Sequence, residues 1–147
     1  MDMIKSIDLA ATPGHLIRRA QQIAVAIFAE HLSAADITPV QFAILNALLD
    51  SPGIDQVNLA KRVAFDPATS GSVIGRLEAK AWVVRQADPA DKRRKLLVVT
   101  PQGIQAMARI QADVARVQDQ ILSPLSQEDQ QRFVALLSQL VQGHEAA

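Results

Sequence analysis

The sequence predicts a mainly α-helical fold of six helices with one small β-hairpin. Outside the hairpin, apolar residues recur at helical spacing along most of the chain. A single polar turn that contains a proline separates two short β-prone runs. A side chain that can cap a helix precedes a proline at four places, which marks helix starts at Thr12-Pro13, Thr38-Pro39, Asp66-Pro67 and Thr100-Pro101.

The first two helices are expected at about residues 13–32 and 39–49. The apolar stripe of the first helix is Leu16, Ala20, Ile23 and Ile27. At the start of the second helix, Thr38 has Gln41 three residues later, which completes a capping box. The run Ser51-Pro52-Gly53 should end this helix.

A short third helix at 56–63, with Asp55 as its cap, and a fourth helix at about 67–80 follow closely. The fourth helix has one face suited to the core, made of Ser70, Val73, Ile74 and Leu77. Its opposite face carries Ala68, Thr69, Ser72, Gly75 and Arg76. Such a small, polar face suits a helix that enters the major groove of DNA. Gly71 and Gly75 lower helix propensity, which close approach to DNA or tight helix packing would explain.

The β-hairpin is expected to pair residues 82–86 with residues 96–100. Its turn carries Asp88, Asp91 and four cations, Lys92, Arg93, Arg94 and Lys95. A basic hairpin can follow a phosphate backbone or enter a minor groove, although a solvated turn is the alternative. Because it directly follows three short helices, it has the position of the wing in a winged helix-turn-helix.

The fifth and sixth helices are expected at 101–122 and 127–141, the sixth with Ser126 as its cap. The stripe of the fifth helix is Ile104, Met107, Ile110, Val114, Val117 and Ile121, close to a coiled-coil seam. A helix of this length spans about 33 Å and would overhang so small a module. A second copy would bury these stripes, so we expect a homodimer held by its N- and C-terminal helices.

Charge is distributed unevenly along the chain. The 147 residues have a formal net charge of zero, but residues 61–95 hold nine cations and four anions. A basic segment within an acidic frame is typical of a DNA-binding module on a neutral scaffold, and chance clustering is the alternative.

Several classes of function lack the residues that they need. The absence of cysteine excludes thiol catalysis, thiol redox sensing and a disulfide scaffold. His15, His31 and His144 lie far apart without metal-ligand spacing, so we expect no metal site, no cofactor, no catalytic residue and no enzyme. The N-terminus lacks the pattern of a signal peptide and no apolar run is long enough to span a membrane, so a cytoplasmic protein is expected.

The segments DPATSGSVIGRLEAKAWVVR and DPADKRRKLLVVTPQG resemble the recognition helix and the wing of the MarR family of bacterial transcriptional regulators. The resemblance covers essentially the full length and implies an N-terminal dimerisation helix (1–37), a winged helix-turn-helix DNA-binding domain (38–100) and C-terminal dimerisation helices (101–147). In that family, the arginine matched by Arg93 typically enters the minor groove and the aspartate matched by Asp91 braces it. Arg94, followed by Lys95, stands where many members have a smaller or neutral residue, and should strengthen nonspecific DNA binding.

The resemblance implies a ligand-responsive regulator, usually a dimeric repressor and less often an activator, on a palindromic operator. The expected DNA-binding residues are Ala68, Thr69, Ser72, Arg76, Asp91, Lys92, Arg93, Arg94 and Lys95. Family members usually respond to a small molecule bound between the dimerisation helices and the DNA-binding lobe. Some regulate aromatic-acid degradation and respond to aromatic acids or to their coenzyme A thioesters.

The candidate effector site is a cationic cluster early in the first helix, formed by His15, Arg18 and Arg19 beside apolar residues. This combination suits a carboxylate or a phosphate-bearing ligand such as an acyl-coenzyme A, so we expect a small anionic effector. Solvation of the helix, or ion pairs across the dimer, is the alternative role of these cations. Two other functions stay open: a constitutive DNA-binding dimer without an effector, and an adaptor whose winged helix binds protein.

Overall fold

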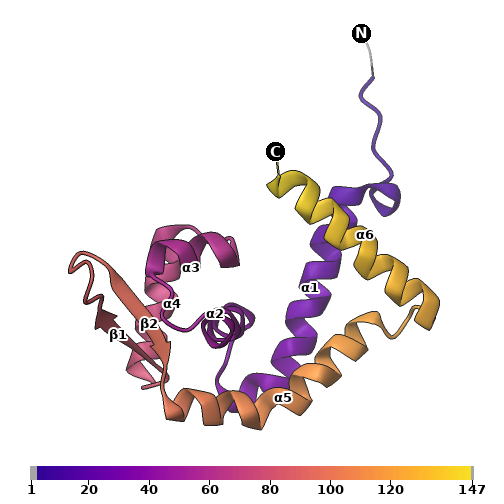
Figure 1. Cartoon of the computed structure of the whole chain (residues 1–147). Helices are drawn as coiled ribbons and strands as arrows, with labels where there is room; N and C mark the ends of the chain where they lie inside the picture. The colour runs from indigo at the N-terminus through magenta and orange to yellow at the C-terminus, as the bar shows by residue number, and fades with distance from the viewer. Residues whose placement is uncertain (1–2, 147) are drawn as a thin grey trace. The chain divides into compact units, whose positions relative to one another are not determined.

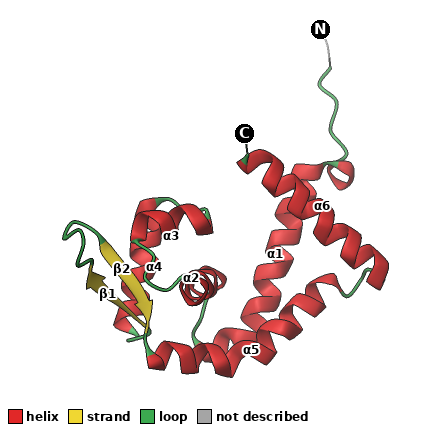
Figure 2. Cartoon of the chain, in the orientation of Figure 1, coloured by secondary structure: helices red, strands yellow, loops and turns green. Residues whose placement is uncertain are grey.

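The computed structural model describes residues 3–146, which form six α-helices and one two-stranded antiparallel hairpin (Figures 1 and 2). The elements are α1 (Pro13–Leu32), α2 (Pro39–Asp50), α3 (Gln56–Val63), α4 (Pro67–Ala79), β1 (Val83–Ala87), β2 (Lys95–Val99), α5 (Pro101–Leu122) and α6 (Gln127–Glu145). Two short 3-10 turns, Leu9–Ala11 and Ser33–Ala35, flank α1. The expected mainly α-helical fold with a small hairpin is therefore confirmed.

The observed bounds differ slightly from the expected ones at the hairpin and at α6. Both strands are shifted by one residue, because Trp82 lies outside the ladder. Its N–H donates to the carbonyl of Leu77 at 3.0 Å and so ends α4, after a turn in which Ala81 has a φ of 63°. The last helix continues to Glu145 rather than ending at 141, since no proline interrupts it.

Side-chain caps fix most of the helix starts, as their sequence pattern predicts. Thr38 and Gln41 form the expected capping box on α2, and Ser126 caps α6. Thr12 is different: α1 does begin at Pro13, but the Thr12 hydroxyl donates to the carbonyl of Asp8 at 2.9 Å. The hydroxyl of this threonine therefore closes the preceding 3-10 turn.

The described residues fall into two compact units, one of residues 28–114 and one of residues up to 27 together with those from 115 onward. The core of the 28–114 unit consists of apolar side chains from the end of α1, from α2, α3 and α4, and from the hairpin. Its fully buried members are Leu32, Ile44, Leu45, Leu48, Leu59, Ile74, Leu77, Val83 and Leu97. Of the core face expected for α4, Ser70, Ile74 and Leu77 are completely buried and Val73 is half-buried.

The hairpin is held against the start of α3 by backbone hydrogen bonds. In the antiparallel register, Val83 lies opposite Val99 and Arg85 lies opposite Leu97. On its other edge, Leu97 donates its N–H to the carbonyl of Ile54 at 3.0 Å, and Asp55 forms a β-bridge with Leu96. The wing and α3 are therefore parts of one hydrogen-bonded frame.

The start of α5 is joined to the base of the hairpin. The Thr100 hydroxyl donates to the carbonyl of Ala81 at 2.6 Å and accepts the N–H of Gly103 at 3.0 Å. A Cβ atom on Gly103 would lie 2.4 Å from the carbonyl oxygen of Trp82 and 2.7 Å from Cγ1 of Val99. Only glycine fits this contact between α5 and the hairpin.

The second unit leaves a large amount of apolar surface open. No residue of α6 is buried, and Leu136 and Val134 are 61% and 53% exposed. Other large apolar side chains exposed in this unit are Leu16, Ile17, Ile23, Phe133, Leu137, Leu140 and Val141. Large exposed apolar surfaces of this kind are rare on proteins that act as monomers in water.

Over the described residues, no single helix is both long and apolar enough to cross a membrane. One bent pair, residues 13–35 with 39–50, satisfies the criterion by length and composition alone.

Gly103→Ala should destabilise the 28–114 unit by roughly 1–3 kcal/mol, because the added methyl group must displace backbone as well as the Val99 side chain. Urea unfolding followed by circular dichroism measures the change. Gly143→Ala in α6 is the matched control, since its Cβ would meet nothing within 4 Å. The control should match or slightly exceed the wild type in stability. Equal stability of the two variants would contradict the packing argument.

Candidate nucleic-acid interface

The exposed face of α4 consists of short side chains and one arginine. All four expected contact residues of this helix, Ala68, Thr69, Ser72 and Arg76, are exposed. They lie on the side of α4 opposite the completely buried Ser70. Because all of them except Arg76 are short, the backbone on this side of α4 is accessible to a large partner such as the major groove of DNA.

Asp66 caps α4 and orients its first turn. One carboxylate oxygen accepts the backbone N–H of Thr69 at 2.9 Å and the other accepts the Thr69 hydroxyl at 2.7 Å. These bonds, the backbone one foremost, lower the pKa of Asp66 below its ordinary value near 3.8. The Thr69 hydroxyl therefore uses its proton within the protein and offers DNA only its acceptor lone pairs.

The two glycines of α4 have different surroundings. A Cβ on Gly71 would lie 3.3 Å from Nε2 of Gln56, at the start of α3, whereas a Cβ on Gly75 would meet nothing within 4 Å. The contact at Gly71 is close but involves the far end of a flexible side chain, so packing restricts this position without requiring glycine. Gly75 lies on the open face, where only a bound partner would come close.

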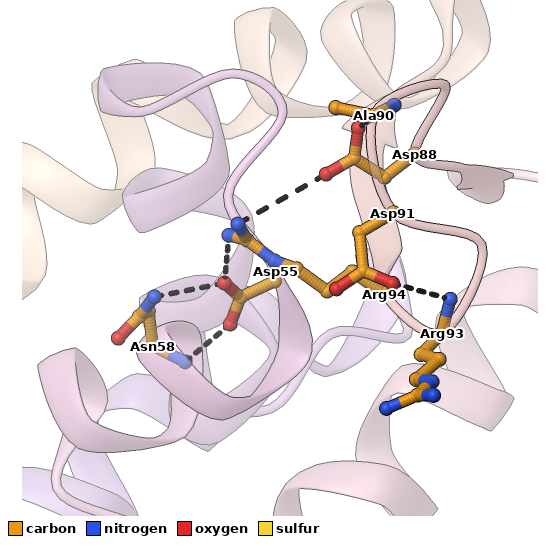
Figure 3. A network of polar contacts seen from close by, with 7 residues as sticks. All are labelled: Asp55, Asn58, Asp88, Ala90, Asp91, Arg93 and Arg94. Atoms are coloured by element: carbon orange, nitrogen blue, oxygen red, sulfur yellow. Dashed lines mark hydrogen bonds and ion pairs between the residues drawn. The ribbon is translucent and has the colours of Figure 1, made fainter.

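The tip of the wing is closed by two aspartates. Asp88 donates its N–H to the carbonyl of Arg94 at 3.1 Å and accepts the N–H of Ala90 on its side chain at 2.9 Å. Asp91 accepts the backbone N–H of Arg93 at 3.0 Å, so it braces Arg93 through the main chain (Figure 3). The Arg93 side chain extends away from the carboxylate of Asp91 (Figure 3).

Arg94 forms ion pairs within the protein, and half of its side chain is exposed. Its guanidinium donates to the carboxylate of Asp55, the N-cap of α3, and its second terminal nitrogen lies 4.0 Å from Oδ2 of Asp88 (Figure 3). The Asp55 side chain is only 10% exposed. The N–H of Asn58, and after it the guanidinium of Arg94, lower the pKa of Asp55 against the opposing effect of burial. Sequence reasoning expected this arginine to face DNA and did not find its partner, which lies 39 residues earlier in the chain.

A surface hollow of about 420 Å³ lies between the start of α3 and the tip end of the wing. It is lined by Asp55, Gln56, Val57, Asn58, Arg93, Arg94 and Lys95. Lys92 is exposed beyond it, at the wing tip. The expected wing cations therefore gather at one side of the 28–114 unit, in which α4 packs against β1.

The candidate effector residues lie on α1 in the other unit. Nη2 of Arg18 lies 3.2 Å from Nδ1 of the half-buried His15, so these two side chains do share a face. Arg19 instead donates to Oε1 of Gln22 at 2.7 Å. The structure therefore brings His15 and Arg18 together and gives Arg19 a separate partner.

Two further hollows lie within the 28–114 unit, and sequence reasoning missed both because their walls join distant segments. One, of about 310 Å³, is lined by Ala34, Ala35, Ile37, Trp82, Ala106, Arg109 and Ile110. The other, of about 300 Å³, is lined by Phe42, Asn46, Leu49, Ile104, Met107, Ala108, Gln111 and Val114. Lys80 lies over the Trp82 ring, 4.6 Å from its centroid. Among residues 3–146, no three His, Asp or Glu side chains are grouped to hold a metal ion.

The chain is similar to known transcriptional regulators. The MarR family pattern matches residues 35–94. The transcriptional regulator HosA of Escherichia coli O111:H- is 34% identical over 106 residues, which are 72% of this chain and 78% of HosA. PcaV of Streptomyces coelicolor, a transcriptional regulator solved with its natural ligand, is 34% identical with a TM-score of 0.88 over 95% of this chain and 98% of that one. Bordetella bronchiseptica BpsR, whose DNA binding is regulated by 6-hydroxynicotinic acid, is 33% identical with a TM-score of 0.82 over 87% and 97%.

Asp66→Asn should lower the melting temperature at neutral pH, and the difference from the wild type should disappear at acid pH. The pKa of Asp66 is lowered in the folded state, so its carboxylate stabilises the fold above about pH 4 and this contribution disappears as the pH falls further. Asparagine keeps the N-cap bond to the Thr69 N–H but removes the charge and the oxygen that accepts the Thr69 hydroxyl. Melting curves of both proteins between about pH 7 and pH 3 measure the effect. A difference in melting temperature that does not change with pH would contradict the assignment.

Proposed function

This chain belongs to the MarR family of transcriptional regulators, and from that premise we propose that it is a dimeric repressor released from a palindromic operator by a small aromatic acid or its coenzyme A thioester. The observation that carries the proposal is the joint presence, in one compact unit, of an exposed small-residue face on α4 and a cationic wing. Acting on DNA, such a regulator would work in the cytoplasm.

The exposed face of α4 would lie in the major groove. Its short side chains let the helix backbone approach, the N–H groups of its first turn would bind phosphate, and Arg76 would reach a phosphate or a guanine. The wing would follow the adjacent backbone with Lys92 and Lys95, while Arg93 enters the minor groove. Phosphate contacts would supply affinity, and the α4 face would supply sequence choice.

A homodimer would place two copies of α4 on two half-sites about one helical turn, roughly 34 Å, apart. The apolar surface of α6 and α1 supports this arrangement, because Leu136 and Leu16 are 61% and 49% exposed. The residue ranges 1–37 and 101–147 would then serve dimerisation, and 38–100 would serve DNA binding.

His15 and Arg18 would hold the acidic group of the effector. Nη2 of Arg18 and Nδ1 of His15 lie 3.2 Å apart on α1. An aromatic acid is favoured because BpsR, a relative over most of the chain, responds to one. A coenzyme A thioester would use Arg18 and Arg19 together on its phosphates. Binding would change the spacing or the mobility of the two DNA-binding units, which couples the two sites.

A gel mobility-shift experiment tests the proposal with the DNA that flanks the gene for this chain, repeated with aromatic acids and their coenzyme A thioesters. Specific, salt-sensitive binding that a ligand abolishes would support it. Specific binding that no ligand changes would indicate the constitutive dimer. A folded dimer with no specific DNA binding would overturn the proposal and favour the protein-binding adaptor.

Arg93→Ala should weaken operator binding by about 10-fold or more per protomer, because it removes the cation proposed for the minor groove. The logarithmic dependence of affinity on salt should also become shallower, by about one unit for each protomer. Arg132→Ala on α6 removes a surface cation of the other unit and is the control. Unchanged affinity of the Arg93 variant would remove the wing from the mechanism.

Arg18→Ala should leave operator binding unchanged and raise the effector concentration needed for release. The reason is that the variant removes the cation beside His15 without touching α4 or the wing. Titration of the preformed complex with effector measures this, again with Arg132→Ala as the control. Release as efficient as that of the wild type would show that the acidic group binds elsewhere, such as beside Arg109.

A further inference from the structure

We propose that Arg94 is a positioning residue, which fixes the wing to the start of α3 through Asp55 and Asp88, and that it does not contact DNA. We call these three residues the wing clamp. The inference rests on the proposed DNA-binding function and adds to it a division of labour within the row of wing cations. Arg93 would meet the DNA, and Arg94 would determine where Arg93 stands.

The carboxylate of Asp55 requires internal partners. It is only 10% exposed, and burial of a charge without partners strongly destabilises a fold. One oxygen accepts the backbone N–H of Asn58 and the other accepts the Asn58 side-chain amide, each at 2.8 Å. The second oxygen also accepts the guanidinium of Arg94, which is the one cation in this arrangement.

The guanidinium of Arg94 joins three segments of the chain. Arg94 directly precedes β2, and its guanidinium binds the N-cap residue of α3. Its Nη1 lies 4.0 Å from Oδ2 of Asp88, on the opposite side of the wing turn. Asp88 is also well shielded, with 14% of its side chain exposed, and its N–H donates to the carbonyl of Arg94 at 3.1 Å. A planar fork with several donors suits this bridging role, which a lysine could not fill in the same way.

The wing clamp is placed where it can determine the position of the tip. Backbone bonds connect β2 to the segment before α3 at Leu96 and Leu97. Closer to the tip than these bonds, the Arg94 side chain provides a further connection to α3. Arg93 directly precedes Arg94 in the sequence. Loss of the clamp would leave the tip held by the β1–β2 ladder, which ends at the pair Ala87 and Lys95, and by the backbone bonds of the turn.

A second connection extends from the clamp to α4. Gln56, the neighbour of Asp55, accepts a hydrogen bond from Arg85 of β1 at 2.7 Å. Arg85 also pairs with Glu78 of α4 at 2.7 Å. The start of α3 is therefore connected to the wing through Asp55 and, by way of Arg85, to α4 through Gln56. These contacts restrain the distance between α4 and Arg93.

Asp55→Asn distinguishes the two possible roles of Arg94, because the two roles predict opposite changes in operator affinity. Asparagine keeps the N-cap of α3 but no longer pairs with the guanidinium. If Arg94 were a DNA contact, the variant would free a cation and remove an anion, and operator affinity would rise. If the wing clamp positions Arg93, affinity should fall by about 10-fold. Mobility shifts at several salt concentrations measure both quantities.

Arg94→Ala supplies a second, independent readout. The clamp predicts weaker operator binding with the salt dependence of the wild type, because no phosphate contact is lost. A phosphate contact would instead make the salt dependence shallower by about two units per dimer, as expected for the control Arg93→Ala. Affinity that stays equal or rises in Asp55→Asn, or a shallower salt dependence in Arg94→Ala, would overturn the inference.

Amide hydrogen exchange keeps the test valid even if the chain binds no DNA. The amides of Asp88 and Arg94, which are bonded within the wing turn, should exchange at least several-fold faster in Asp55→Asn, with those inside α2 unchanged. Unchanged exchange in the wing would overturn the clamp. Absence of DNA binding by the wild type, with faster exchange in the variant, would overturn the proposed function and leave the clamp intact.

Discussion

The carboxylate of Asp55 has to find partners for both of its oxygens, because the fold removes it almost entirely from water. One set of partners is local and starts α3. The other partner is Arg94, which directly precedes β2 and lies 39 residues later in the chain. A single charged group therefore specifies both where a helix begins and which segment lies against it. The β-bridge between Asp55 and Leu96 joins the same two segments, the start of α3 and the wing.

The opposite end of the hairpin is organised by shape rather than by charge. Gly103 brings α5 into contact with the carbonyl of Trp82, and Thr100 ties the same helix to Ala81. The hairpin is thus held at its tip end by an ion pair and at its base by close packing. Both contacts restrain the hairpin relative to the rest of the 28–114 unit.

Much of the fold could be predicted because its signals are local. A capping side chain followed by proline marks α2, α4 and α5 within a few residues, and the periodicity of α4 identifies its buried and exposed faces. The strand ends were less accurate, because the amide of Trp82 is taken by Leu77 at the end of α4. Tertiary contact decides such positions.

The candidate site was only partly accessible to sequence reasoning for the same reason. The wing cations can be read from the turn, but the pairing of Arg94 with Asp55 spans 39 positions and has no local pattern. The separation of Arg19 from His15 and Arg18 depends on side-chain partners that spacing alone does not reveal. The hollows beside Trp82 and between α2 and α5 join residues more than 60 positions apart.

Gly75 gives the recognition helix room for evolutionary change. A side chain added there would meet no atom of the protein within 4 Å, whereas one added at Gly71 would press on Gln56. Substitution at 75 would also favour the helix itself. If α4 binds DNA as proposed, a descendant of this chain could acquire a new base contact at that position without repacking its core, and its operator preference could change while the scaffold stays the same.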